Sequence, residues 1–152
     1  MFVGGTGILV FLDLVAYLLR RLLASPDAGP GYAIFNGEEF PDLDDGFELV
    51  MYAAFPRRSE AIGLDLCEGA ARVSSKLARG RGGFRFVPIF SREGGERLTP
   101  ESIERIMSEH TRNGRIRKLW VCGPPPMNET FERALEYLAP KYEISPQDCE
   151  VL

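Results

Sequence analysis

Short apolar runs alternate with helix-like segments along the whole chain, and this alternation restricts the possible fold more than any other feature. The apolar runs are expected to form strands at residues 1–3, 47–55, 84–90, 116–122 and 150–152. Between these runs the sequence predicts helices at residues 9–24, 60–78, 100–111 and 128–138. Strands separated by helices favour an α/β fold with a mainly parallel sheet and right-handed crossovers. We therefore expect a Rossmann-like three-layer sandwich whose five-stranded sheet has the order 3-2-1-4-5.

The length of the chain limits the number of domains. Its 152 residues suffice for one domain with a hydrophobic core and are too few for two of ordinary size. We therefore assign residues 1–152 to a single domain that contains a long acidic insertion at residues 25–46. Such a connection is typical of a solvated surface segment, and a docking surface for a basic partner is the alternative interpretation.

Charge and cysteine content exclude several classes of function. The chain has 18 Lys and Arg against 22 Asp and Glu, and its net charge of −4 argues against a nucleic acid as partner. Cys67, Cys122 and Cys149 are widely spaced, and His110 is the only histidine, so we expect neither a metal site nor a disulfide framework. We expect His110 at the surface. Unpaired cysteines are typical of the cytoplasm or another reducing compartment.

The apolar start of the chain has two interpretations. From Met1 to Leu19 the only charged residue is Asp13, which makes a membrane span one of them. A charge inside a span costs about 2.5–3.5 kcal/mol, and the glycines at positions 4, 5 and 7 favour a loop. We therefore predict a buried strand end, a turn and a helix packed on the sheet. Membrane association through segments outside this sequence stays an alternative.

The turn Gly4-Gly5-Thr6-Gly7 joins the first expected strand to the first expected helix. Glycines let a backbone approach a phosphate closely, and the start of a helix presents free N–H groups and the positive end of its dipole. Thr6 adds a hydroxyl group. The third glycine of the usual dinucleotide fingerprint is missing, so a plain strand-to-helix connection is the alternative interpretation.

A second unusual turn, Cys122-Gly123-Pro124-Pro125-Pro126-Met127, follows the fourth expected strand. Because proline fixes φ, we expect a rigid, non-helical wall there, with the next helix capped by Asn128. We expect the thiol of Cys122 to face a ligand, and a buried thiol beside a stiff turn is the alternative. In an open parallel sheet, ligands bind where the strand order reverses, which the first and fourth strands usually flank.

Together the two turns resemble the signature motifs of the nicotinamide-nucleotide-binding domain in the ferredoxin–NADP reductase superfamily. The second turn is most similar to that of the cytochrome b-type reductases and of the flavin module of nitrate reductase. The resemblance covers essentially the whole chain. It implies a domain that binds NADPH or NADH and passes hydride to FAD for onward electron transfer, with the cofactors supplying the chemistry.

The resemblance also implies a role for each turn. The residues implied to hold the cofactor pyrophosphate are Gly4, Gly5, Thr6 and Gly7. The residues implied to lie beside the nicotinamide ring or to wall its site are Cys122, Gly123, Pro124, Pro125 and Met127. Within this second set, the resemblance gives Cys122 the catalytic position next to the ring and the flavin.

A third segment, Ser91-Arg92, resembles the part of NADP-preferring members that grips the 2′-phosphate of the adenosine ribose. Arginine suits this role because its planar fork pairs with phosphate in a bidentate way. Arg97 is expected to add a second charge. The acid typical of NAD-binding proteins is missing after the second strand, where Arg57 and Arg58 stand, which slightly favours NADPH. An ordinary solvated turn is the alternative for Ser91-Arg92.

One departure from the family is large. The family carries a flavin-binding β-barrel ahead of this domain, and no match to its flavin motif occurs in this sequence. We therefore expect the chain to be part of a longer reductase, with FAD bound mainly by the missing domain and a redox protein as possible acceptor. The isolated chain should bind the nucleotide weakly and reduce nothing. The competing hypothesis is a non-catalytic nucleotide-binding or protein-interaction module of the same fold.

Overall fold

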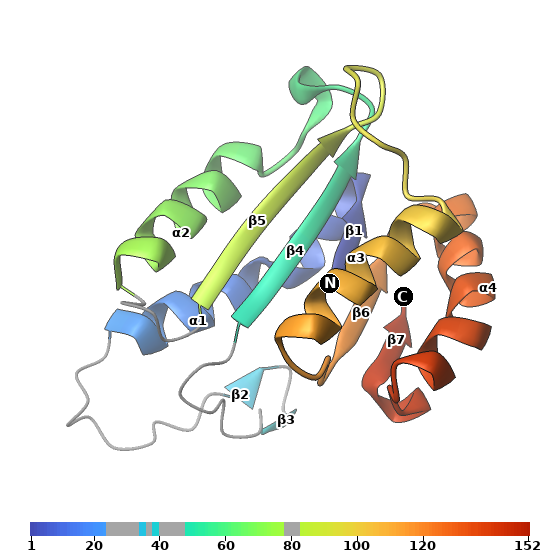
Figure 1. The fold of residues 1–152 in the computed structure, drawn as a ribbon. Coiled ribbons are helices and arrows are strands. Elements are labelled where there is room, and N and C mark those ends of the chain that lie inside the picture. The colour runs from blue at the N-terminus through green and yellow to red at the C-terminus, as the bar shows by residue number, and fades with distance from the viewer. Residues whose placement is uncertain (24–33, 36–37, 40–47, 78–82) are drawn as a thin grey trace. The chain divides into compact units, whose positions relative to one another are not determined.

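The computed structural model describes residues 1–23, 34–35, 38–39, 48–77 and 83–152. Its main sheet consists of β1 (Phe2–Gly4), β4 (Glu48–Phe55), β5 (Gly83–Phe90), β6 (Leu119–Cys122) and β7 (Cys149–Val151). Figure 1 shows these five strands in the spatial order β5-β4-β1-β6-β7. Counted along the chain this is the order 3-2-1-4-5, and the sheet is parallel throughout. The predicted α/β fold and strand order are therefore confirmed.

Within the described residues, four α-helices lie between successive strands of this sheet. They are α1 (Leu12–Leu23), α2 (Leu64–Leu77), α3 (Pro100–Asn113) and α4 (Pro125–Lys141). The first helical segment begins as a 3₁₀-helix at Gly5–Phe11 and becomes α-helical only at Leu12, not at residue 9 as predicted. The predicted start of the second helix at residue 60 is also wrong. Gly63 has φ of 74°, a left-handed conformation that an α-helix excludes, so α2 begins after it.

The prolines after β6 do not form the predicted non-helical wall. Pro125 and Pro126 occupy the first turn of α4, and Pro124 rather than Asn128 is its N-cap. A proline fits there because the N–H that it lacks would have no acceptor inside the helix, and its φ already suits the helix. At its other end α4 extends past the expected boundary to Lys141, and β6 is shorter than predicted.

The chain folds into two compact units. The second unit consists of Leu9–Met51 and Gly63–Val87. In it α1 packs against α2, and the amide of Phe84 donates a hydrogen bond of 2.7 Å to the buried hydroxyl of Ser74. A short antiparallel pair, β2 (Ile34–Phe35) with β3 (Glu38–Glu39), lies in the long acidic insertion. The rest of residues 25–46 lies outside the described residues, and the alternative prediction of a docking surface for a basic partner falls largely on them.

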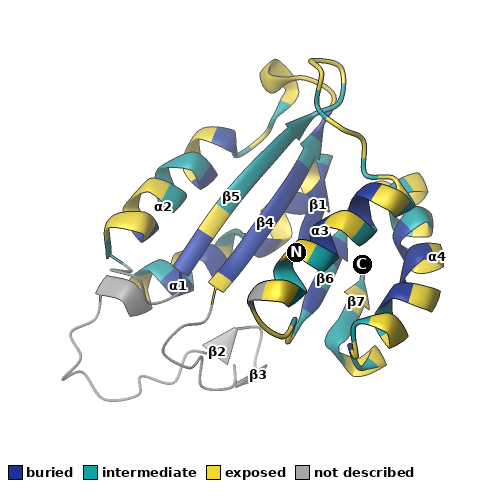
Figure 2. Cartoon of the chain, viewed as in Figure 1, coloured by how far each residue is buried: buried dark blue, intermediate teal, exposed yellow. Residues whose placement is uncertain are grey.

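The first unit consists of Met1–Ile8, Tyr52–Ile62 and Pro88–Leu152. In its core the ring of Phe2 lies 5.2 Å from that of Tyr52, its partner in β4, and 4.7 Å from that of Phe131 in α4. Successive residues of β1 are buried (Figure 2), as expected of a central strand in a parallel sheet. Helix α4 contacts β6, β7 and α3.

The third helix begins as the sequence predicts, but its histidine does not lie where expected. Thr99 is the N-cap of α3, and the structure adds a capping box with Ser102. His110 was predicted at the surface, and this is wrong: its ring is half-buried and hydrogen-bonded to the Tyr52 hydroxyl at 2.9 Å. No helix within the described ranges has the length and apolar character needed to cross a membrane.

Candidate functional site

The site residues predicted from the sequence all belong to the first unit, at the carboxyl ends of β1, β4, β5 and β6. We call this end of the sheet the carboxyl edge. In the register of the sheet, Val3 lies opposite Cys122 in β6, and Gly4 lies opposite Ala54 in β4. The turn after β1 therefore starts beside the end of β6. The structure brings the two predicted motif turns together, although more than a hundred residues separate them in the sequence.

Gly7 lies against the last residue of β6. A Cβ atom on Gly7 would be 2.1 Å from the carbonyl oxygen of Cys122 and 3.1 Å from its Sγ. No side chain fits at that distance from a backbone that is fixed in a β-ladder. Packing against β6 is therefore sufficient reason for the glycine, in addition to any ligand that approaches the turn.

Met127 fills the space between the two turns. A Cβ on Gly4 would be 2.7 Å from the Sδ of Met127, and a Cβ on Gly123 would be 2.6 Å from the same atom. The pyrrolidine ring of Pro124 also lies against Gly4, because its Cδ would be 2.9 Å from a Cβ there. The two glycines thus make room for the half-buried thioether, and the two turns pack as one body.

The start of the first helical segment presents backbone donors. Gly5 has φ of 53°, and a Cβ there would meet nothing within 4 Å, so conformation rather than space requires a glycine. The 3₁₀-helix at Gly5–Phe11 runs directly into α1. The N–H of Thr6 has no acceptor within such a segment, whereas the pairing of Gly4 with Ala54 points the Gly5 N–H toward the Ala54 carbonyl. Thr6 is exposed, so this turn offers a backbone N–H and a hydroxyl to an anion.

The start of α4 presents no backbone N–H groups to a ligand. Pro125 and Pro126 have no N–H, and the amides of Met127 and Asn128 both donate to the carbonyl of Pro124, at 2.9 Å and 3.2 Å. Burial raises the pKa of the Cys122 thiol, which keeps this half-buried group uncharged at neutral pH. The segment Gly123–Met127, which we call the proline turn, is therefore a rigid and largely apolar surface. It is unsuited to a phosphate and suited to a flat, uncharged ring.

Arginines gather at the ends of β4 and β5. The amide of Ser91 donates to the Phe55 carbonyl at 3.0 Å, and the amide of Arg92 donates to the Pro56 carbonyl at 2.9 Å. These bonds hold Ser91 and Arg92 beside the turn that carries Arg57. Both arginines are exposed, and within the described ranges neither guanidinium takes part in an ion pair. Two cationic groups are thus available to an anionic ligand at this side of the carboxyl edge.

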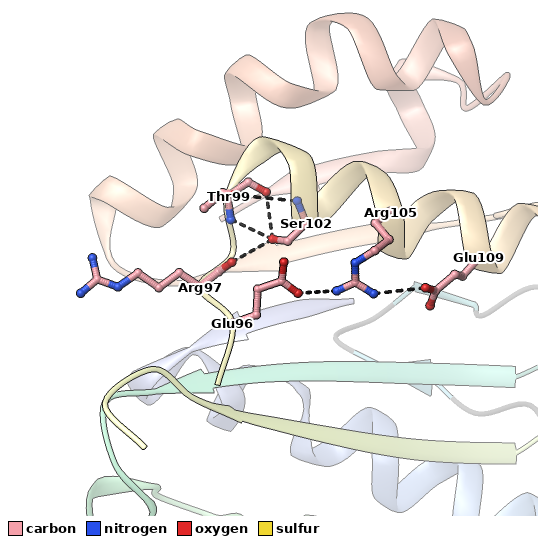
Figure 3. A network of polar contacts seen from close by, with 6 residues as sticks. All are labelled: Glu96, Arg97, Thr99, Ser102, Arg105 and Glu109. Atoms are coloured by element: carbon pink, nitrogen blue, oxygen red, sulfur yellow. Dashed lines mark hydrogen bonds and ion pairs between the residues drawn. The ribbon is translucent and has the colours of Figure 1, made fainter. Parts of the chain in front are cut away.

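Helix α3 holds the segment that carries Arg97 (Figure 3). The hydroxyl of Ser102 donates to the Arg97 carbonyl at 2.8 Å, while Arg105 bridges the carboxylates of Glu96 and Glu109. The Arg97 side chain points away from this network (Figure 3). The hydrogen bond from Ser102 therefore fixes the backbone of Arg97 and leaves its side chain outside the ion pairs of Arg105.

Sequence reasoning missed one contact at this edge. The guanidinium carbon of Arg58 lies over the ring of Phe90, 5.8 Å from its centroid. The signal was present, because the predicted strand order makes the second and third strands neighbours, which brings the residues after one strand next to the end of the other.

The described residues contain no cluster of three or more His, Cys, Asp or Glu side chains that could hold a metal ion. Comparisons of the chain with protein-family models, with curated proteins and with solved structures find no match. The chemistry of the carboxyl edge is therefore the basis for assigning a function.

Proposed function

We propose that the carboxyl edge binds a nicotinamide dinucleotide, with NADPH favoured over NADH, as part of a flavin-dependent reductase. One observation carries the proposal: two helix starts with opposite chemistry lie side by side at the ends of β1 and β6. The first presents a backbone N–H and the hydroxyl of Thr6, and the second presents proline rings and an uncharged thiol. A dinucleotide needs both kinds of surface, because it joins a charged pyrophosphate to a flat ring.

The remaining contacts follow from the order of the strands. The pyrophosphate lies over Gly5 and Thr6, and the nicotinamide ring lies beside Cys122 and Gly123. The 2′-phosphate pairs with Arg92. Ser91 and Arg92 are fixed by backbone hydrogen bonds to the end of β4, so their positions do not have to be ordered when the ligand binds.

The residues of this chain bind and orient the ligand. Hydride transfer belongs to the nicotinamide and to FAD, which the proposal assigns mainly to a separate domain. The uncharged Cys122 thiol lies at the end of β6, where it limits the approach of water and the tilt of the ring. The isolated chain accordingly binds the nucleotide and catalyses no reduction.

Isothermal titration of the chain with NADPH and with NADH tests the proposal. We expect NADPH to bind more tightly, and Arg92→Ala to weaken NADPH binding about tenfold while leaving NADH binding unchanged. Arg133→Ala is the matched control, since Arg133 is an exposed arginine on α4 that pairs with Glu129 in its own helix. Binding of neither nucleotide to the folded chain would refute the assignment. Equal binding of both, insensitive to Arg92→Ala, would refute the role in 2′-phosphate recognition.

One observation favours a second candidate, a non-catalytic module of the same fold. Met127 occupies the space beside Gly4 and Gly123, so the glycines of both turns already have a role in packing. A folded chain that binds neither nucleotide would support this candidate. Tight NADPH binding that depends on Arg92 would exclude it.

A further inference from the structure

Three side chains form a stacked group where β4 and β5 end. Phe55 is buried, and its ring stacks on that of Phe90 with centroids 6.4 Å apart and planes 29° apart. The guanidinium carbon of the exposed Arg58 lies 5.8 Å from the centroid of the Phe90 ring. The core therefore fixes the orientation of Phe90, and Phe90 in turn supports a flat cation at the surface.

Hydrogen bonds fix the backbone around this group. The amide of Arg58 donates to a carboxylate oxygen of Glu93 at 3.0 Å, so the turn after β5 holds the turn after β4. The amides of Ser91 and Arg92 donate in the opposite direction, to carbonyl groups at the end of β4. Because hydrogen bonds run in both directions between the two turns, the turns hold each other in place. The backbone position of Arg58 is therefore set before any ligand binds.

We propose that the Arg58–Phe90 stack binds the adenine ring of the dinucleotide. The inference rests on the proposed function and names the contact that recognises the adenosine half of the ligand. A guanidinium plane stacks on the face of a nucleobase and adds a cation–π attraction. An arginine already packed on an aromatic ring loses less side-chain freedom when the base binds.

The location of the stack agrees with the rest of the ligand. The end of β4 lies next to β1, whose turn is proposed for the pyrophosphate. In NADPH the adenine and the 2′-phosphate are attached to the same ribose, so their protein contacts must come from neighbouring residues. Arg58 and Arg92 meet this requirement, because the Arg92 amide bonds to Pro56, two residues before Arg58.

Titration with adenosine 2′,5′-bisphosphate isolates this half of the ligand from the nicotinamide. We expect Arg58→Leu to weaken its binding about tenfold. Arg58→Lys should weaken it nearly as much, because the charge stays and the flat stacking surface is lost. Arg133→Leu is the control: it removes an exposed arginine of α4 that pairs with Glu129 in its own helix, and its effect should stay below about threefold.

Nuclear magnetic resonance supplies a readout that loss of charge alone would not change. On addition of the bisphosphate, the Nε–H resonance of Arg58 should shift upfield, because the proton lies over the face of the adenine ring. Inorganic phosphate, which has no ring, should not cause this shift. The Arg58→Leu and Arg58→Lys proteins should still unfold cooperatively, with the midpoint lowered by at most a few degrees, because the contact with Phe90 is exposed and worth about 0.5–1 kcal/mol.

The outcomes separate this inference from the proposed function. If the parent chain binds neither NADPH nor the bisphosphate, the proposed function fails, and the inference fails with it. If the parent chain binds NADPH while Arg58→Lys keeps full affinity for the bisphosphate, the stacking inference alone is overturned. An upfield shift at Arg58 together with weaker binding in both Arg58 variants supports it.

Discussion

The turns after β1 and β6 hold neighbouring positions in the sheet, and their chemistry is opposite. Each follows a parallel strand and leads into a helix, and Val3 lies opposite Cys122 where the two strands end. The glycine turn, Gly4–Gly7, presents the N–H and the hydroxyl of the exposed Thr6 at its helix start. The proline turn, Gly123–Met127, lacks three N–H groups because it contains three prolines, and the amide of Met127 donates to the Pro124 carbonyl.

The comparison shows that a helix start after a parallel strand is not by itself an anion site. A helix dipole acts after β1 and after β6, but a phosphate also needs N–H groups that point at it. Glycines in one turn and prolines in the other therefore divide the carboxyl edge into a polar and an apolar part. Substitutions in either turn, or at the contact between them, test this division into a polar and an apolar part.

The largest effect is expected for Gly7→Ala, which acts on the contact between the two turns. The new Cβ would lie 2.1 Å from the carbonyl oxygen of Cys122, whose backbone is held in the β1–β6 ladder. We expect the free energy of unfolding to fall by about 3 kcal/mol, measured by urea denaturation. Gly69→Ala in α2 is the control, since its Cβ would meet only the end of the Arg72 side chain at 3.9 Å. That change should stabilise the chain by about 0.5–1 kcal/mol.

Thr6→Asp tests the polar half of the comparison, because it should act on folding and on binding with opposite signs. A carboxylate at a helix start stabilises the helix by about 0.3–1 kcal/mol. The same charge repels a pyrophosphate, so NADPH should bind at least about tenfold more weakly. Calorimetric titration measures the change in NADPH affinity, and thermal unfolding of the same protein measures the change in stability.

Pro126→Asp is the matched control in the proline turn, and Thr6→Asn is the uncharged control at the same position. The aspartate at position 126 should leave NADPH affinity within about threefold of the parent chain, because no phosphate lies there. Equal losses in the two aspartate variants would contradict the division of the edge into a polar and an apolar turn.

The smallest expected effect concerns the thiol of Cys122. Burial raises its pKa, so at a given pH the folded chain holds less thiolate than the unfolded chain does. The rate of alkylation by iodoacetamide, followed at Cys122 by peptide mass spectrometry, should therefore rise at a higher pH in the folded chain than in urea. NADPH should slow the reaction further. Rapid alkylation of the folded chain at neutral pH would place a charge in the proline turn and contradict its apolar character.

The sequence predicted the elements better than their ends. Apolar runs indicated the five strands of the main sheet, because burial on both faces of a parallel sheet leaves a clear local pattern, whereas the short β2–β3 pair was missed. The start of α4 was missed because three prolines suggest a break, whereas the first turn of a helix accepts proline. The half-buried His110 was missed because its partner, Tyr52, lies 58 residues away in the sequence.

The sequence also predicted only part of the candidate site. The residue types in both turns and the segment Ser91-Arg92 were evident from the sequence, as was the expectation that they end at one edge of a sheet. The sequence did not show which glycines are needed for packing, because Gly4 and Gly7 contact Met127 and Cys122, which lie far along the chain. The stack of Arg58 on Phe90 likewise depends on the pairing of β4 with β5.

The sequence by itself determined the fold class and the chemical character of each turn, since these depend on local residue type and periodicity, and the fold class in turn predicted the strand order. Only the tertiary structure decided that Met127 lies between the two turns, that Gly7 abuts the Cys122 carbonyl, and that Arg58 lies over Phe90. The physical reason is that a close contact depends on strand register and on the direction of each side chain, which neighbours far away in the sequence fix.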